Sequence, residues 1–288
     1  MPQASAKRNF VSGEIIRKKS GWSSPRGWGF HLTLAGAPRQ HVLVPRYLLV
    51  DISNSFTKAA RSDGRKLGRV RRIPTRELAA DSFDFERVDG IVVSSVVPKK
   101  TRLFHRRKLP PVIEVGAGVD LGIAIDYPNP DRIGADRLAN AVACAELYGC
   151  PAIVVDFGTA VTFDVLSAQR AYIGGIIAPG LSAMTDYLHE KTALLPRVEL
   201  AEPKRIIGKS TEEAMRVGAV VGYRGLIEKL VREISVEAFR GRKVPVVATG
   251  GDAKLIAAGL PLFTAVDPEL TLRGLQLIAH RNFRSATT

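Results

Sequence analysis

The chain has 288 residues, of which 45% are hydrophobic and 24% are charged, a composition typical of a folded globular protein. It contains no run of about 18 apolar residues, so no membrane-spanning helix is expected. Its two cysteines, Cys144 and Cys150, are too few for a disulfide framework or a zinc site, and the length allows two domains of ordinary size in a cytoplasmic setting.

The formal net charge of +14 indicates attraction to anions. Such an excess is typical of nucleic-acid binding, but it also helps to attract small anionic substrates. The densest basic run covers residues 99–108 and contains one aromatic residue, Phe104. We interpret this run as a solvated helix face or loop rather than a nucleic-acid patch.

Residues 1–46 differ in composition from the rest of the chain, because their Lys and Arg residues are accompanied by a single acid, Glu14. An Arg-rich, acid-poor segment resembles an organelle transit peptide. Two alternatives stay open: residues 21–34 pair as a hairpin, or the native protein begins near Tyr47. We expect this basic N-terminal extension to be peripheral and flexible, so that truncation to Tyr47 leaves activity intact.

From Tyr47 onward, short apolar strands alternate with helical patterns. For residues 47–149 we expect a hairpin at Leu48–Thr57, strands at Leu67–Ile73, Gly90–Val96 and Val112–Val115, a short helix at Thr75–Ala80 and a longer helix at Arg137–Tyr148 closed by Gly149.

Residues 150–288 repeat this order. We expect a hairpin at Ile153–Phe163, strands at Ala171–Ala178 and Val244–Thr249, and helices at Ser182–Glu190, at Thr211–Val236 and from Ala253 through Ala258. A strand followed by Gly250-Gly251 and a helix start is suited to an anion, although glycines there also permit close helix–sheet packing.

The two hairpins resemble each other, and this duplication organises the chain. Aligned without a gap, Asp51 falls on Asp156 and Thr57 falls on Thr162. In each copy an apolar strand ends in Asp, and a turn rich in hydroxyl and backbone N–H groups comes next. Two copies facing each other across a cleft predict a nucleotide site, in which the carboxylates hold cations.

Five motifs occur in the same order as in a known family. They are Asp51–Lys58, Gly134–Arg137, Asp156–Thr162, Gly174–Gly180 and Thr249–Ala253. Together they resemble the type III pantothenate kinases of the actin-like ATPase superfamily, to which the Bvg accessory factor proteins are related. The resemblance covers nearly everything from Tyr47 onward.

The resemblance implies an α/β fold with two ribonuclease-H-like halves, residues 47–149 and 150–288. Each half would be a mixed β-sheet flanked by helices, with a cleft between them. The implied activity is ATP-dependent phosphorylation of pantothenate to 4'-phosphopantothenate, the first step of coenzyme A biosynthesis. The resemblance also implies ATP with Mg²⁺, a monovalent cation (K⁺ or NH₄⁺) and a homodimer, and we expect neither a membrane nor a nucleic acid as a partner.

The resemblance places the phosphates of ATP on the first loop and on Thr159. The loop residues are Asp51, Ile52, Ser53, Asn54, Ser55, Phe56, Thr57 and Lys58. Asp51 is implied to orient Mg²⁺ or its water, because hard cations prefer carboxylate oxygens. Asp156 is implied to bind the monovalent cation.

The same resemblance places pantothenate on Gly134, Ala135, Asp136 and Arg137. Asp136 would be the base that accepts the hydroxyl proton, since phosphoryl transfer needs a carboxylate to direct the alcohol. Without the resemblance, Asp136 would be interpreted as the N-cap of a helix that begins at Arg137. Arg137 could meet the substrate carboxylate in a bidentate pair.

Tyr127 and Thr211 match family residues that contact pantothenate, the second of them near the dimer interface. A buried packing role for Tyr127 stays open. A helix-cap role for Thr211, reinforced by Glu213 in the first turn, stays open as well.

One position departs from the family pattern, because Ser53 stands where a glycine is usual and where the second hairpin has Gly158. If the loop needs a positive φ there, Ser53 costs on the order of 1 kcal/mol. On that hypothesis Ser53→Gly lowers the KM for ATP; a slightly shifted loop, in which the serine hydroxyl replaces a backbone donor, is the alternative.

The runner-up function is that of a non-catalytic accessory relative that binds nucleic acid through its positive charge, and a kinase of another small alcohol comes third. The joint presence of Asp51, Asp136, Arg137 and Asp156 favours the pantothenate kinase, since a binding module needs none of the four.

Overall fold

The computed structural model describes residues 46–64 and 66–284, which belong to one compact unit. The basic N-terminal extension predicted over residues 1–46 therefore lies outside the described residues, apart from Arg46. No helix in the described ranges is both long and apolar enough to cross a membrane.

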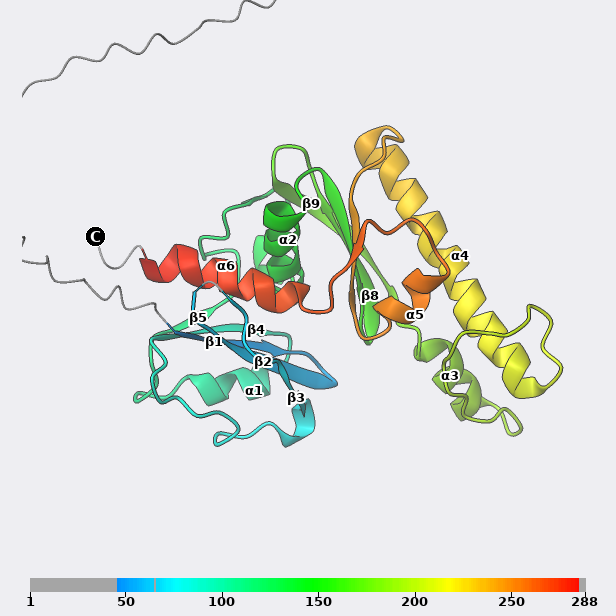
Figure 1. Cartoon of the computed structure of the whole chain (residues 1–288), viewed down its shortest axis with the longest axis horizontal. Helices are drawn as coiled ribbons and strands as arrows, with labels where there is room; N and C mark the ends of the chain where they lie inside the picture. The colour runs from blue at the N-terminus through cyan, green and yellow to red at the C-terminus, as the bar shows by residue number, and fades with distance from the viewer. Residues whose placement is uncertain (1–45, 65, 285–288) are drawn as a thin grey trace, which may run out of the picture. The chain divides into compact units, whose positions relative to one another are not determined.

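The first sheet has five strands in the order β3-β2-β1-β4-β5 (Figure 1). Their bounds are Tyr47–Ile52 for β1, Phe56–Ser62 for β2, Arg71–Pro74 for β3, Gly90–Ser95 for β4 and Val112–Glu114 for β5. Strands β1, β2 and β3 are antiparallel neighbours, whereas β4 runs parallel to β1 and β5 runs parallel to β4. The apolar runs of β1 and β4 are buried on both faces, as is usual for central parallel strands.

The second sheet repeats this plan. Its strands are β7 (Ala152–Phe157), β8 (Ala160–Leu166), β9 (Ala171–Pro179), β10 (Val246–Gly250) and β11 (Ala265–Val266), with β6 (Ala124–Ile125) added beside β9. The pairs β7–β8 and β8–β9 are antiparallel, and β10 runs parallel to β7 and β11. Both sheets thus have the same order and directions, which confirms the predicted duplication of a ribonuclease-H-like unit.

Helices flank both sheets. They are α1 (Pro98–Thr101), α2 (Ala135–Leu147), α3 (Ala183–Lys191), α4 (Thr211–Phe239), α5 (Ala253–Ala258) and α6 (Leu270–Arg284), with short 3-10 turns η1 (Thr75–Glu77), η2 (Arg102–Phe104) and η3 (Pro130–Arg132). After α2 the chain leaves the helix at Gly149, whose φ of 86° suits a glycine.

Helices α2 and α6 pack against each other between the two sheets (Figure 1). Their core includes Leu49 from β1 and Val154 from β7, so side chains of both sheets contribute to it. Gly274 of α6 lies against the backbone of Ala139 in α2, and a side chain there would collide with that carbonyl. Two elements pack across the expected boundary between residues 149 and 150. Strand β6 precedes the boundary but pairs in the second sheet, and helix α6 follows it but packs on β1 and β4 of the first sheet. The boundary therefore stays a prediction.

Two expected elements differ from the structure, and one long helix was not expected. The strand expected at Leu67–Ile73 begins only at Arg71, because Gly68 donates its N–H to the Arg61 carbonyl in a loop at 2.8 Å. The helix expected from Thr75 is a single 3-10 turn. Helix α6 had no counterpart among the expected elements.

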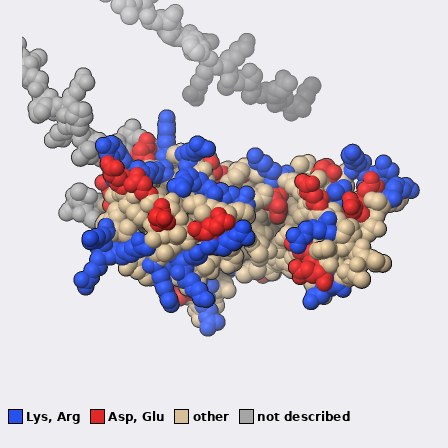
Figure 2. Space-filling view, turned by 90° about the horizontal axis from the view of Figure 1, so that it is seen from below, with Lys and Arg blue, Asp and Glu red and all other residues tan. Residues whose placement is uncertain are grey.

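The basic residues do not form one continuous patch on the face shown in Figure 2. Lys and Arg side chains extend over much of this face, and Asp and Glu side chains lie among them. The positive charge is therefore dispersed among acidic side chains on this face.

Candidate active site

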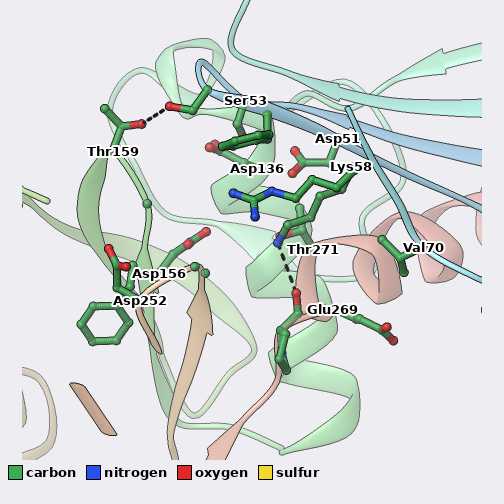
Figure 3. A pocket seen from close by; sticks show the side chains of 18 of the residues that line it. Asp51, Ser53, Lys58, Val70, Asp136, Asp156, Thr159, Asp252, Glu269 and Thr271 are labelled. Atoms are coloured by element: carbon green, nitrogen blue, oxygen red, sulfur yellow. Dashed lines mark hydrogen bonds between the residues drawn. The ribbon is translucent and has the colours of Figure 1, made fainter. Parts of the chain in front are cut away.

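A cavity of about 570 Å³ lies between the two sheets. Its walls come from the tips of both hairpins, the start of α2, the loop after β10 and the start of α6 (Figure 3). Eight of the predicted site residues line it, namely Asp51, Ser53, Ser55, Phe56, Lys58, Asp136, Asp156 and Thr159.

The tips of the two hairpins meet at this cavity. The hydroxyl oxygens of Ser55 and Thr159 lie 3.2 Å apart, within hydrogen-bond distance. The two copies therefore face each other, as the duplication predicted.

The gapless alignment of the two hairpins is wrong by one residue in their second strands. Asp51 pairs with Lys58 across the first hairpin, whereas Asp156 pairs with Thr162 across the second. The turn of the second hairpin is one residue shorter, because Gly158 donates its N–H to the carbonyl of Ala160, two residues on. Lys58 rather than Thr57 is thus the structural counterpart of Thr162.

The strained-loop hypothesis for Ser53 is also wrong. Ser53 is absent from the described residues with positive φ, and Gly158 has no positive φ either. A Cβ at Gly158 would lie 3.4 Å from the carbonyl oxygen of Ala160, which is an acceptable contact. Neither loop therefore demands glycine at this position, and Ser53 donates its N–H to the Phe56 carbonyl at 3.3 Å.

We now expect Ser53→Gly to leave the KM for ATP within about twofold of the wild-type value, because the substitution relieves no strain. Added chain flexibility should instead lower stability by roughly 0.5–1 kcal/mol. Steady-state ADP release measures the first quantity and thermal unfolding the second. Ser53→Ala is the control that removes the hydroxyl but keeps Cβ, and a fivefold drop in KM for Ser53→Gly alone would restore the strained-loop hypothesis.

Three carboxylates from different elements interact in the cavity. Asp51 and Asp156 are the penultimate residues of β1 and β7, and Asp136 lies in the first turn of α2. Burial raises the pKa of Asp51 to about 7, the charges of Asp136 and Asp156 contribute to this rise, and Lys58 opposes them. Burial likewise raises the pKa values of Asp136 and Asp156. The site therefore favours the binding of protons or cations.

One oxygen of Asp51 is left without a partner. Asp51 Oδ1 is buried and makes no hydrogen bond of normal geometry within the described part of the chain, although the Ser94 hydroxyl on the paired strand β4 lies near enough to lower the pKa of Asp51 slightly. A buried carboxylate oxygen without a donor is suited to a metal ion or to a water that a metal holds. The side chain therefore fits the magnesium role that the resemblance implied.

Asp156 is held by two consecutive hydrogen bonds, called here the relay, which run from α6 through α2 to β7. Asn140 of α2 donates from Nδ2 to Asp156 Oδ2 at 2.8 Å, and the Thr271 hydroxyl of α6 donates to Asn140 Oδ1 at 2.8 Å. The relay fixes the carboxylate and uses only one of its oxygens. Thr249 Oγ1, on the neighbouring strand in register with Asp156, is buried without a partner among the described residues.

Asp136 is not the N-cap of its helix. Helix α2 begins at Ala135 with Gly134 as N-cap, and Asp136 Oδ1 accepts the N–H of Arg137 at 2.8 Å. A Cβ at Gly134 would lie 2.5 Å from Asp136 Oδ1. Gly134 thus leaves the carboxylate the space that it occupies, and this steric role does not need a direct contact with a substrate.

Two cations of the first sheet face the cavity side by side. Lys58 and Arg72 are cross-strand partners on β2 and β3, and both line the cavity. Lys58 donates from Nζ to the carbonyl of Pro268 at 3.3 Å, and the Arg72 guanidinium lies 3.6 Å from the centroid of the Phe56 ring. Arg72 was not among the predicted residues, because no motif contains β3.

The glycine pair at the end of β10, Gly250 and Gly251, forms the opposite wall. Gly250 has a φ of 94°, and a Cβ there would lie 2.6 Å from Asp156 Oδ1. Only glycine suits this turn, because both the conformation and the space exclude a side chain. Gly251, Asp252 and Lys254 complete the wall, which agrees with an anion-facing corner at this strand end.

Arg137 lies outside the cavity lining and is held by a buried carboxylate. Its Nε donates to Asp164 Oδ1 at 2.7 Å, and its Cζ lies 5.8 Å from the centroid of the Tyr172 ring. Tyr127 packs edge-on against Tyr172 with ring centroids 6.2 Å apart. Two predicted pantothenate residues, Arg137 and Tyr127, are therefore joined through Tyr172.

The remaining predicted residues are placed elsewhere. Ile52, Thr57 and Ala135 are buried outside the cavity lining, and Asn54 is exposed at the first hairpin tip. The alternative cap role of Thr211 is wrong, because Ser210 is the N-cap of α4 and accepts the Glu213 N–H at 3.2 Å. Thr211 is exposed and does not reach the cavity.

Sequence reasoning missed the contribution of α6. Glu269 and Thr271 line the cavity at the start of this helix. A signal was present, because the buried residues Leu275, Ile278 and Ala279 have a helical spacing. The role of Asn140 had no comparable signal, since its two partners are distant in sequence.

These features define the class of the protein. Two duplicated ribonuclease-H-like sheets enclose a cavity with buried carboxylates and paired cations, an arrangement suited to ATP-dependent phosphoryl transfer. The fold and site are those of an actin-like kinase.

Comparison with known proteins gives the family. The family model described as type III pantothenate kinase matches residues 47–233. The type III pantothenate kinase of Methylacidiphilum infernorum (isolate V4) is 48% identical over 235 residues, which cover 80% of this chain and 87% of the relative. That of Akkermansia muciniphila is 48% identical over 241 residues, covering 82% of this chain and 99% of the relative. The chain belongs to the type III pantothenate kinase family.

A solved structure supports the fold. A Baf family protein from Campylobacter jejuni matches with a TM-score of 0.57 at 21% identity, over 82% of this chain and 99% of that chain. At this identity the likeness concerns the fold alone.

Proposed function

We propose that this enzyme transfers the γ-phosphoryl group of ATP to the primary hydroxyl of pantothenate, the first step of coenzyme A biosynthesis, within the cavity between its two sheets. The observation that carries the proposal is the meeting of Asp51, Asp136 and Asp156 with Lys58 in that single cavity. Family membership names the substrate.

Asp136 is the base in this proposal. Its pKa is raised by burial and partly lowered again by the N–H and charge of Arg137. A raised pKa makes a carboxylate a better proton acceptor near neutral pH. As the hydroxyl oxygen attacks the γ-phosphorus, its proton passes to Asp136 and ADP leaves.

The two hairpin tips hold the phosphates of ATP. Hydroxyl groups of Ser55 and Thr159 lie at the meeting point of the tips, and Lys58 and Arg72 supply positive charge from adjacent strands. Because phosphoryl transfer is mainly positioning and charge neutralisation, these donors contribute by fixing the reacting phosphate beside Asp136.

Asp51 holds Mg²⁺ or its water, and Asp156 holds the monovalent cation. The partnerless Oδ1 of Asp51 supports the first assignment. The second rests on Asp156, which keeps one carboxylate oxygen outside the Asn140 hydrogen bond. When bound, the metal ion neutralises charge on the transferred phosphate.

The active form is a homodimer in this proposal. Thr211 does not reach the cavity of its own chain, so its predicted contact with pantothenate would need a second copy. The segment between β9 and α4 also exposes large apolar side chains, including Tyr187, Leu194, Ile206 and Ile207. Such a concentration of exposed apolar surface is typical of an interface. Light scattering should give twice the chain mass, and a monomer at assay concentration would contradict the dimer.

The activity is tested by ADP release with ATP, Mg²⁺ and pantothenate, in K⁺ or in Na⁺. Turnover that requires pantothenate and is faster in K⁺ is the expected result. Turnover without a K⁺ preference would remove the cation assignment of Asp156. Absence of pantothenate-dependent turnover from folded protein would overturn the proposed function.

A further inference from the structure

Asp164, on β8, is a buried carboxylate that no motif singled out. Its side chain has 0% exposure. Oδ1 accepts two hydrogen bonds, from Arg137 Nε at 2.7 Å and from the Tyr172 hydroxyl at 3.0 Å, while Oδ2 has no partner among the described residues. Burying an ion pair is unfavourable unless its geometry is good, so the pair is weak evidence for a purely stabilising role.

Asp164 sets the direction of the Arg137 guanidinium. It engages Nε, the donor nearest the chain, and Nη2 has only a long contact of 3.5 Å with the Phe163 carbonyl. Nη1 makes no hydrogen bond within the described ranges. The two terminal nitrogens of this side chain, which is 13% exposed, therefore keep most of their hydrogen-bonding capacity, and they form the end of the fork that binds a carboxylate through two parallel hydrogen bonds.

The surroundings restrict Arg137 to this orientation. The guanidinium lies near the Tyr172 ring, at 5.8 Å from Cζ to the centroid. On β9, a Cβ at Gly175 would collide first with the Phe163 carbonyl, and it would also lie 2.6 Å from Nη2, so the guanidinium occupies space beside a backbone position that only glycine suits. Tyr127, whose ring is exposed, packs edge-on against Tyr172, the same ring that the guanidinium lies near.

We propose that Asp164 is a positioning residue that holds Arg137 with its terminal nitrogens toward the pantothenate carboxylate, and that it thereby gives the enzyme its preference for the acid over neutral analogues. The inference rests on the proposed function, because it takes Arg137 as the carboxylate contact. Asp164 itself touches no substrate and acts through the guanidinium.

The test compares pantothenate with pantothenyl alcohol, in which a hydroxymethyl group replaces the carboxylate. Calorimetric dissociation constants of both compounds are measured for the full chain and its variants. The wild type should bind the acid at least about tenfold more tightly. In Asp164→Asn that ratio should fall toward one, since a hydrogen bond between two charged groups is lost, while the affinity for the alcohol and the KM for ATP stay within about threefold.

Asp267→Asn is the matched control. Asp267 is also buried, and it pairs with Arg273 at 3.2 Å and with the Tyr148 hydroxyl at 3.2 Å. Its loss removes the same kind of pair at another place and should leave the acid-to-alcohol ratio unchanged. If Asp164→Asn does not fold, Asp164→Glu keeps the charge but displaces the oxygen by one methylene, and it should lower the ratio as well.

Two outcomes would overturn the inference. Equal weakening of both compounds by Asp164→Asn would show a structural role only, and an unchanged ratio would show no role. Arg137→Lys separates this failure from that of the proposed function. If Arg137→Lys loses the preference and Asp164→Asn keeps it, only the positioning role falls; if Arg137→Lys also keeps it, Arg137 is not the carboxylate contact.

Discussion

Replacement of Asp136 by asparagine is expected to lower kcat by about 10²–10⁴-fold, the usual contribution of a general base. The amide keeps the shape of the side chain and can still accept the N–H of Arg137, which lies 2.8 Å from the carboxylate in the wild type, but it cannot take the hydroxyl proton. The KM for ATP should change less than about threefold, because the hairpin tips that hold the phosphates stay in place. Steady-state ADP release measures both constants.

The pH dependence of kcat/KM for pantothenate is a second test of Asp136. Because burial raises the pKa of Asp136, the wild-type kcat/KM for pantothenate should rise with pH as this carboxylate loses its proton. This rise of kcat/KM with pH should be absent in Asp136→Asn. Glu269→Gln is the control, an acid-to-amide change in the same cavity but beside α6, and it should lower kcat less than about fivefold. A loss of less than tenfold in Asp136→Asn would assign the base elsewhere.

Local patterns predicted the strands that build the site. The apolar runs of β1, β4 and β7 are continuous in sequence and buried in the structure, so each could be recognised without its partners. The carboxylates at the ends of β1 and β7 were predicted from the same runs. The facing of the two hairpins was also predictable, because a duplicated strand–turn motif in one fold places its copies symmetrically.

Other features depend on contacts that local patterns do not contain. The one-residue difference between the hairpins arises in the turn, where Gly158 bonds to Ala160, and a gapless comparison hides it. The relay from Thr271 through Asn140 to Asp156 joins residues separated by up to 131 positions. Arg72 faces the cavity only because β3 pairs in register with β2.

The glycines show the same division. Gly158 stands at the position for which the strained-loop hypothesis supposed a positive φ, yet it has no positive φ. Gly134 and Gly250 are required for space, since a Cβ at either would collide with a cavity carboxylate, Asp136 or Asp156. Such steric demands come from tertiary neighbours, whereas the sequence shows only that a glycine is present.

Replacement of Asp51 by asparagine is expected to have opposite effects on activity and on stability. Activity should fall at least about 100-fold, because the charge that faces the metal and phosphates is lost. The ligand-free protein should nevertheless melt a few degrees higher, on the order of what 1–2 kcal/mol produces in a chain of this size. In the wild type a buried carboxylate with a partnerless oxygen lies close to Asp136 and Asp156, and asparagine removes that repulsion.

The pH dependence of the higher melting temperature of Asp51→Asn identifies the cause of this stabilisation. Burial and the two neighbouring carboxylates raise the pKa of Asp51 from 3.8 to about 7, so between these values the folded state binds more protons than the unfolded state. The contribution of Asp51 to the free energy of unfolding therefore falls as the pH rises through this window. Melting curves of ligand-free protein without Mg²⁺ should show a gain for Asp51→Asn that is small near about pH 5 and larger near about pH 8. Asp267→Asn is the control. It breaks the ion pair with Arg273 and should instead lower the melting temperature. A similar drop for Asp51→Asn at both pH values would mean that Asp51 is a structural carboxylate rather than one kept unpaired for a cation.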